Sequence, residues 1–150
     1  MSSVGVVLKN LNPLLTPELL AALAEMGHGD VIAVVDRNYP AYTRGGNVIE
    51  LPGVGIAGAI EAILSVMPLE TYAEPAVVHM LTDDGGDSPA TPGLRDLWNR
   101  MDGRTVPDQG VSRRGDVGFY ARADEAYVTV HTSETLPYAC YLLTKGVVSA

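Results

Sequence analysis

Apolar residues recur every three to four positions in several segments of the chain, which is the spacing of one face of a helix. The clearest case follows Thr16, which can cap the first free amides, and Pro17, which suits the first turn of a helix. Gly27 then ends this apolar stripe. The pattern predicts helices over residues 16–26, over 56–67, over the segment that follows Pro92, and over 121–126.

Short apolar or alternating runs between these helices predict strands. The run from Val31 to Val35 is apolar throughout and leads to Asp36, as expected of a strand that is buried on both faces. Strands are expected over residues 31–36, 47–51, 76–81, 127–131 and 138–144. Because strands alternate with helices, the sequence predicts an α/β fold, a single domain over residues 1–150 with a central β-sheet flanked by helices.

Composition and charge narrow the classes of ligand. The 150 residues are 47% hydrophobic and 19% charged, which is ordinary for one folded domain. Eighteen acidic against ten basic residues give a net charge of −8, which argues against binding to nucleic acid or to an anionic membrane surface. Cys140 is the single cysteine, and no signal-like or membrane-spanning apolar stretch is present. A cytoplasmic protein with a neutral ligand, such as a free sugar, is therefore expected.

Two proton-handling side chains flank the first predicted strand. His28 lies in a glycine-flanked turn where the backbone can approach a ligand, and Asp36 follows the strand, the usual place for ligands in open α/β sheets. Imidazole titrates near neutral pH and can give or take a proton. The residues alone also permit an exposed turn histidine and an aspartate that closes a turn onto backbone amides. We take the pair as a candidate site.

Several stretches of the chain resemble the L-fucose mutarotase and D-ribose pyranase family. They are Pro17-Glu-Leu-Leu, Glu25-Met-Gly-His-Gly-Asp30, Asp36, Pro40-Ala41, Pro68-Leu-Glu-Thr-Tyr72, Phe119-Tyr-Ala-Arg-Ala123, Pro137-Tyr138 and Lys145-Gly-Val147. The resemblance covers nearly the whole chain, and residues 83–110 match only loosely. It implies the family's α/β fold and a homo-oligomer, namely a ring-like decamer with sites at subunit contacts.

The resemblance also implies an activity and roles for individual residues. The implied reaction interconverts anomers or ring forms of a free reducing monosaccharide, with no cofactor and no metal. His28 corresponds to the family's catalytic histidine, and Asp36 to a residue that binds sugar hydroxyls. Tyr120 and Tyr138 correspond to substrate-binding tyrosines, whose rings suit the flat C–H faces of a sugar.

One departure from the family pattern lies before Tyr120. The fucose enzymes carry an arginine four residues earlier, where this chain has Asp116. Asp116 would therefore face the sugar with an acceptor in place of a donor. Arg113 and Arg114 are close in sequence and could supply a guanidinium through a shift of the loop, although exposed arginines beside a glycine are more often solvated.

A second departure follows Tyr138. The family's Gly-Asn is replaced by Ala139 and Cys140, which take the corresponding substrate-binding positions. Cys140 lacks a recognisable base and is not predicted to be a nucleophile. The family's histidine after Pro-Ala is also replaced, by Tyr42. These changes alter sugar recognition more than proton transfer, so L-fucose is not assumed to be the substrate.

Two other classes of protein fit the same residues. One is a non-catalytic sugar-binding protein that kept the fold, and the other is a structural oligomer in which His28 only caps a helix. Exchange between sugar anomers would distinguish an enzyme from both.

Three further patterns are weak. His79 and His131 each lie in a strand-like run without a second ligand at metal spacing. The acidic stretch over residues 83–87 lacks the spacing and final glutamate of a calcium loop. The glycines over residues 53–58 lack the acidic residue of a dinucleotide site. Neither a metal nor a nucleotide is predicted.

Overall fold

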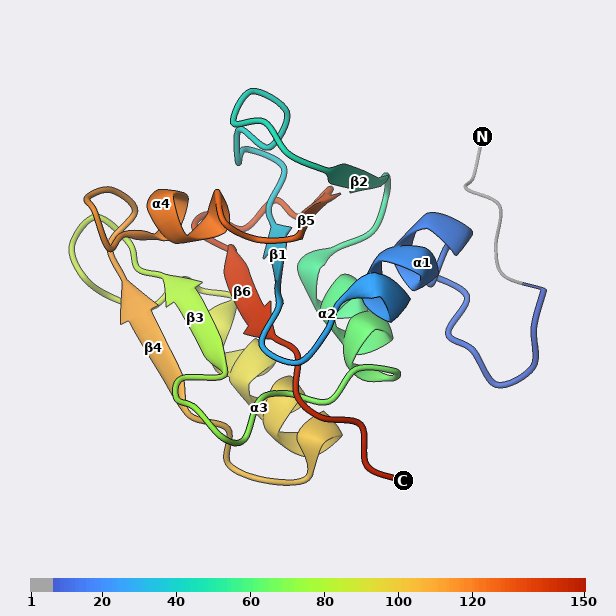
Figure 1. Cartoon of the computed structure of the whole chain (residues 1–150). Coiled ribbons are helices and arrows are strands. Elements are labelled where there is room, and N and C mark those ends of the chain that lie inside the picture. The colour runs from blue at the N-terminus through green and yellow to red at the C-terminus, as the bar shows by residue number, and fades with distance from the viewer. Residues whose placement is uncertain (1–6) are drawn as a thin grey trace.

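A mixed β-sheet with helices on both faces organises residues 7–150, the part of the chain that the computed structural model describes (Figure 1). The elements are α1 (Pro17–Glu25), β1 (Val31–Val35), β2 (Val48–Leu51), α2 (Ile56–Leu64), β3 (Val77–Met80), α3 (Thr91–Asp102), β4 (Asp108–Val111), α4 (Phe119–Ala123), β5 (Val128–Thr132) and β6 (Tyr141–Thr144). The α/β fold with a central sheet is thus confirmed.

The direction of the strands decides which loops meet. The sheet order is β2-β5-β1-β6-β3-β4, and β1, β2 and β5 pair in parallel, as do β3 and β4. Strand β6 runs antiparallel between β1 and β3. The carboxyl ends of β1 and β3 therefore lie together with the start of β6 at one end of the strands. The start of β1 lies with the end of β6 at the opposite end of the strands.

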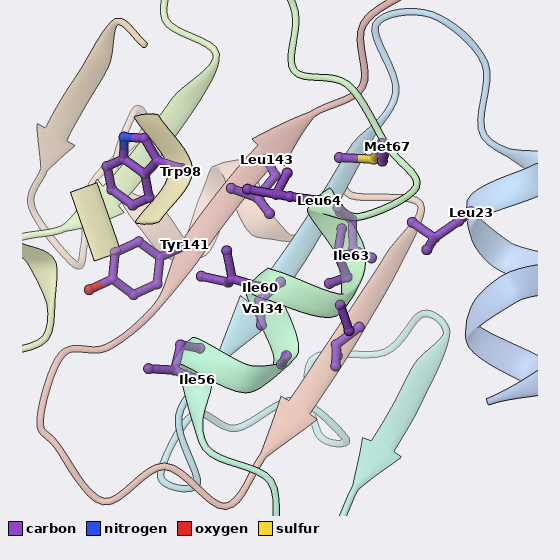
Figure 2. Packing of buried hydrophobic residues seen from close by; sticks show 14 of the residues in the cluster. Leu23, Val34, Ile56, Ile60, Ile63, Leu64, Met67, Trp98, Tyr141 and Leu143 are labelled. Atoms are coloured by element: carbon purple, nitrogen blue, oxygen red, sulfur yellow. The ribbon is translucent and has the colours of Figure 1, made fainter. Parts of the chain in front are cut away.

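The larger core lies on the sheet face covered by α1, α2 and α3. Ile32 and Val34 of β1 point into it because alternate residues of a strand face opposite sides. Figure 2 shows Ile60 of α2 beside Val34 and Leu143 of the sheet. Trp98 of α3 is fully buried in the same core.

The second core lies on the other face, which α4 covers (Figure 1). Here Ala33 and Val35 of β1 pack with Phe119 and Ala123 of α4. Tyr39, from the loop that follows β1, is also buried in this core. Strand β1 is thus covered on both faces, as its continuous apolar run predicts.

Most predicted elements are confirmed, and the differences have local causes. The predicted helix over 121–126 is instead α4, which begins and ends earlier. The amide of Tyr127 donates to the carbonyl of Val31 at 2.9 Å, which draws the chain into the sheet. The second helix ends at Leu64 rather than 67, and residues 65–66 form a turn.

Two strands also differ from the sequence prediction. The last strand begins at Tyr141 rather than 138, because Tyr138 adopts a left-handed φ of 59° that no strand permits. Strand β4 was not predicted at all. Its sequence, Asp-Gln-Gly-Val, is short and polar, and it pairs only with β3 at the sheet edge.

Candidate active site

A pocket of about 200 Å³ opens at the end of the sheet where β1 and β3 end and β6 begins. Its lining residues are Asp36, Asn38, Tyr39, Met80, Arg113, Tyr120, Pro137, Tyr138 and Cys140. They come from the ends of β1 and β3, the loop before α4, α4 itself and the segment before β6. The parallel arrangement of β1 and β3 with an antiparallel β6 is what brings these segments together.

Asp36 is a buried carboxylate held by backbone amides. Its Oδ1 accepts from the amides of Asn38 and Tyr39 at 3.0 and 3.1 Å, and its Oδ2 accepts from that of Ala139 at 3.2 Å. Burial raises the pKa of Asp36 above its ordinary value, and these amides and the Cys140 thiol only partly offset that effect. A fixed carboxylate of this kind can accept a hydroxyl proton in a hydrogen bond.

The two tyrosines predicted from the sequence both line the pocket. The ring of Tyr120 meets Tyr39 edge-on at 5.3 Å, and the guanidinium of Arg44 lies 4.6 Å from its centroid. Tyr138 is held in its left-handed conformation next to Pro137, whose carbonyl accepts from the hydroxyl of Ser88 at 2.6 Å. The ring of Tyr120 and the backbone of Tyr138 are therefore positioned by the fold.

Arg113 brings a positive charge to this pocket. Its Nη2 lies 3.5 Å from Oδ1 of Asp83, and its Nε is buried with no hydrogen-bond partner in residues 7–150. A hydrogen bond to Asp83 raises the pKa of the Tyr138 hydroxyl above its ordinary value. Asp83 therefore contacts both polar groups at the mouth of the pocket. Arg113, not the neighbouring Arg114, is the arginine that lines it.

The replaced family positions fall in different places. Cys140 lines the pocket, and burial raises the pKa of its thiol well above the ordinary value, which keeps it protonated. Ala139 is buried behind the pocket and contributes its amide to Asp36. Asp116 is exposed in the turn before α4 and does not line the pocket. A two-glycine loop around this turn gives no local signal from which its path could be predicted.

His28 does not line this pocket, so the structure does not bring His28 and Asp36 together within one chain. The five residues of β1 separate them, and a strand of that length spans roughly 17 Å at about 3.3 Å per residue. The two side chains therefore lie at opposite ends of β1. Flanking one strand places residues at its two ends, not side by side.

A residue that the sequence interpretation did not select holds His28. The Nε2 of His28 lies 2.7 Å from Oε2 of Glu70, which is only 5% exposed. The Tyr72 ring meets the imidazole edge-on at 5.6 Å. Glu70 lies within the family-like stretch of residues 68–72, which was the available signal, but its partner is 42 positions away.

Two other histidines take part in ion networks. His79 is buried beside Asp108 at 3.1 Å, and His131 lies 2.8 Å from Glu50. In residues 7–150 no group of three or more metal-ligating side chains is present. No helix in that part of the chain is long and apolar enough to cross a membrane.

Comparison with known proteins connects this architecture to sugars. Residues 9–148 match the RbsD / FucU transport protein family. The chain belongs to this family. The fucose mutarotase from Streptococcus pneumoniae, solved in complex with L-fucose, is 36% identical to this chain, with a TM-score of 0.86. That alignment covers 95% of this chain and all of the other.

Two further structures belong to the comparison. A candidate sugar-binding protein, Atu2016, is 34% identical with a TM-score of 0.89, over 98% of this chain and all of the other. The Bacillus subtilis RbsD complexed with D-ribose is 19% identical with a TM-score of 0.69, over 99% of this chain and all of the other, and shows the shared fold. Membership of the RbsD / FucU family gives this chain a sugar-related function.

Proposed function

We propose that this protein is a mutarotase or pyranase, which interconverts the anomers or ring forms of a free reducing monosaccharide. The pocket around Asp36 carries the proposal. It offers a buried carboxylate that accepts hydroxyls, a guanidinium that donates to them, and two positioned aromatic rings. The 36% sequence identity to a fucose mutarotase, over 95% of this chain, supports the same chemistry.

Ring opening of a reducing sugar needs two proton movements. One proton is given to the ring oxygen and one is taken from the anomeric hydroxyl, and both movements reverse after the aldehyde rotates. An imidazole can do either, because its neutral form has one donor nitrogen and one acceptor nitrogen. His28 fits this role, and Asp36, Tyr120, Tyr138 and Arg113 hold the sugar.

Because His28 lies far from the Asp36 pocket of its own chain, the proposed active site needs residues from two subunits. We propose that the chain forms a homo-oligomer, as a ring-like decamer, in which His28 of one subunit reaches the pocket of the next. Exposed apolar side chains support an association surface. Tyr42 is 62% exposed, and Val148 near the C-terminus is 69% exposed.

Anomer exchange measured by saturation-transfer NMR on a panel of free sugars tests the activity. We expect at least one pentose or hexose to exchange, and His28→Ala to lower that rate about 10²–10⁴-fold, the usual contribution of one general acid or base. The exposed His28 side chain carries little core area, so circular dichroism should report an unchanged fold. Undiminished exchange by His28→Ala would remove His28 from the mechanism.

Subunit mixing tests the shared site. Asp36→Ala should also be inactive, because it removes the pocket carboxylate. When His28→Ala and Asp36→Ala chains are co-expressed, some contacts in the mixed ring join an intact His28 to an intact pocket. Recovered exchange supports a site between subunits, whereas no recovery in verified mixed oligomers contradicts it.

Sugar binding without turnover is the second candidate function. The distance between His28 and Asp36 within one chain favours it, since a lone subunit would hold a sugar without an acid or base beside it. Line broadening of sugar signals without anomer exchange would identify a binder.

A further inference from the structure

Both carboxylate oxygens of Glu70 take part in hydrogen bonds. Its Oε1 accepts from the amides of Thr71 and Tyr72 at 2.8 and 2.9 Å, and its Oε2 faces Nε2 of His28 at 2.7 Å. The amide of Tyr72 and then the imidazole lower the pKa of Glu70 below its ordinary value. Glu70 is therefore anionic at neutral pH, so the proton shared with His28 resides on Nε2.

The segment that carries Glu70 is fixed to the rest of the molecule. The Glu70 amide donates to the carbonyl of Thr144 at 3.0 Å. Its own carbonyl accepts from the guanidinium of Arg104 at 2.8 Å. The carboxylate is thus held by its backbone as well as by its side-chain contacts.

The turn that carries His28 is also fixed by backbone hydrogen bonds. Asp30 accepts from the amide of Gly27 at 2.8 Å and bridges the turn. On the other side, the amide of Gly29 donates to the carbonyl of Lys145 at 2.9 Å, and the amide of Lys145 donates to the carbonyl of Asp30 at 2.9 Å. The two segments are thus bound to consecutive residues at the end of β6, and they face each other through the His28–Glu70 contact and the adjacent Tyr72 ring.

We propose that Glu70 is a positioning residue that holds His28 in the Nε2-protonated tautomer and presents Nδ1 as the atom that exchanges protons with the sugar. This inference rests on the proposed function. Among residues 7–150, the contact with Glu70 is the one side-chain hydrogen bond of His28, so Nδ1 is free to face a substrate. The 46% exposure of the imidazole side chain is consistent with a group that acts across a surface.

Glu70→Gln is a sharp test because the surroundings dictate how glutamine must sit. The two backbone amides require an acceptor, so the glutamine oxygen takes the place of Oε1. Its NH₂ group then faces Nε2 of His28 and can only donate. The imidazole is forced into the opposite tautomer, with the proton on Nδ1 and the lone pair turned away from the sugar.

The first measurement is anomer exchange by the full-length protein. For Glu70→Gln we expect kcat to fall about 10²–10⁴-fold, as when an acid/base group is in the wrong tautomer, with KM changed less than about twofold. The control is Glu74→Gln, the same substitution at an exposed position of the same segment, which should keep full activity.

The second measurement is the tautomer itself, from nitrogen NMR of protein labelled in the rings of its three histidines. The His28 signals are assigned by their loss in His28→Gln. We expect Nε2 protonated in the parent protein and Nδ1 protonated in Glu70→Gln.

The inference is overturned if Glu70→Gln keeps the parent tautomer, or if it inverts the tautomer and keeps full exchange while His28→Ala has lost it. A fall in kcat with an inverted tautomer and an unchanged melting temperature supports it. If the parent protein exchanges no sugar, the proposed function is wrong, and an Nδ1-protonated His28 in that protein would overturn the positioning role as well.

Discussion

Arg113 shows how a single side chain can change the character of a pocket. Its Nε is buried without a partner among the described residues, and an unpaired buried donor costs about 1–3 kcal/mol. A sugar hydroxyl or ring oxygen that accepts from this guanidinium would remove that cost. Of the two arginines that the sequence left open, Arg113 is the one that lines the pocket.

Replacing Arg113 with methionine keeps the length of the side chain and removes the charge. We expect kcat/KM for the preferred sugar to fall about 10- to 100-fold, because a hydrogen bond to a charged donor contributes about 1.5–3 kcal/mol. Arg114→Met is the matched control, since Arg114 is exposed outside the Asp36 pocket. Equal losses in the two variants would show that the pocket arginine has no special role.

At the scale of elements, a glycine brings the end of β6 against the segment before β3. A Cβ added to Gly146 would lie 2.5 Å from the Leu69 carbonyl oxygen and 3.2 Å from the Glu70 nitrogen. Both are backbone atoms and cannot move aside as a flexible side chain could. Gly146 therefore sets the distance between the chain end and the residue that holds His28.

Gly146→Ala should push Leu69 and Glu70 away. We expect a loss of about 1–3 kcal/mol in the free energy of unfolding, as for overpacking elsewhere, and slower anomer exchange. Gly93→Ala in α3 is the contrasting variant, because a Cβ there meets nothing within 4 Å. It should gain up to about 1 kcal/mol from helix propensity. Urea unfolding and NMR exchange measure both effects, and a Gly146→Ala protein as stable as the parent would contradict the steric argument.

At the scale of the whole molecule, carboxylates with lowered pKa values make the stability of the fold dependent on pH. Asp108 of β4 is bound by Arg95 of α3 through contacts of 2.9 and 3.1 Å. Burial raises the pKa of Asp108, but the pairing with Arg95 outweighs it, and the net value lies below the ordinary 3.8. The pKa values of Glu70 and Glu134 are also lowered. Each of these three carboxylates binds a proton more readily in the unfolded chain than in the folded one. The stability that they contribute to the folded protein is therefore complete above their ordinary pKa values. It is lost as the pH falls through the lowered pKa values.

Asp108→Asn should therefore cost about 1–3 kcal/mol of unfolding free energy at neutral pH, through loss of a charged hydrogen-bond partner. The difference from the parent should shrink as the pH falls below 3.8, where the parent Asp108 also becomes protonated. Asp96→Asn, at an exposed position of the same helix α3, is the control. Urea titrations across this pH range measure the difference, and a gap that widens in acid would contradict the assigned sign.

Local patterns in the sequence determined most of the fold. Thr16 accepts from the amide of Leu19 as the cap of α1, and the continuous apolar run of β1 is buried on both faces. Such features follow from the chain's own neighbours, and so does the placement of Asp36 at a strand end. Tyr120 and Tyr138, which were selected through the family resemblance, both line the pocket.

Only the tertiary structure decided how these residues combine. Whether His28 and Asp36 meet within one chain depends on β1, which separates them by its whole length. The choice of Arg113 depends on the path of an irregular loop, and the His28–Glu70 contact joins residues 42 positions apart. Periodicity and capping record contacts within a few residues, whereas these pairings arise from the order and direction of strands. That is the physical reason why local patterns indicated candidate residues, whereas the fold decided which of them lie together.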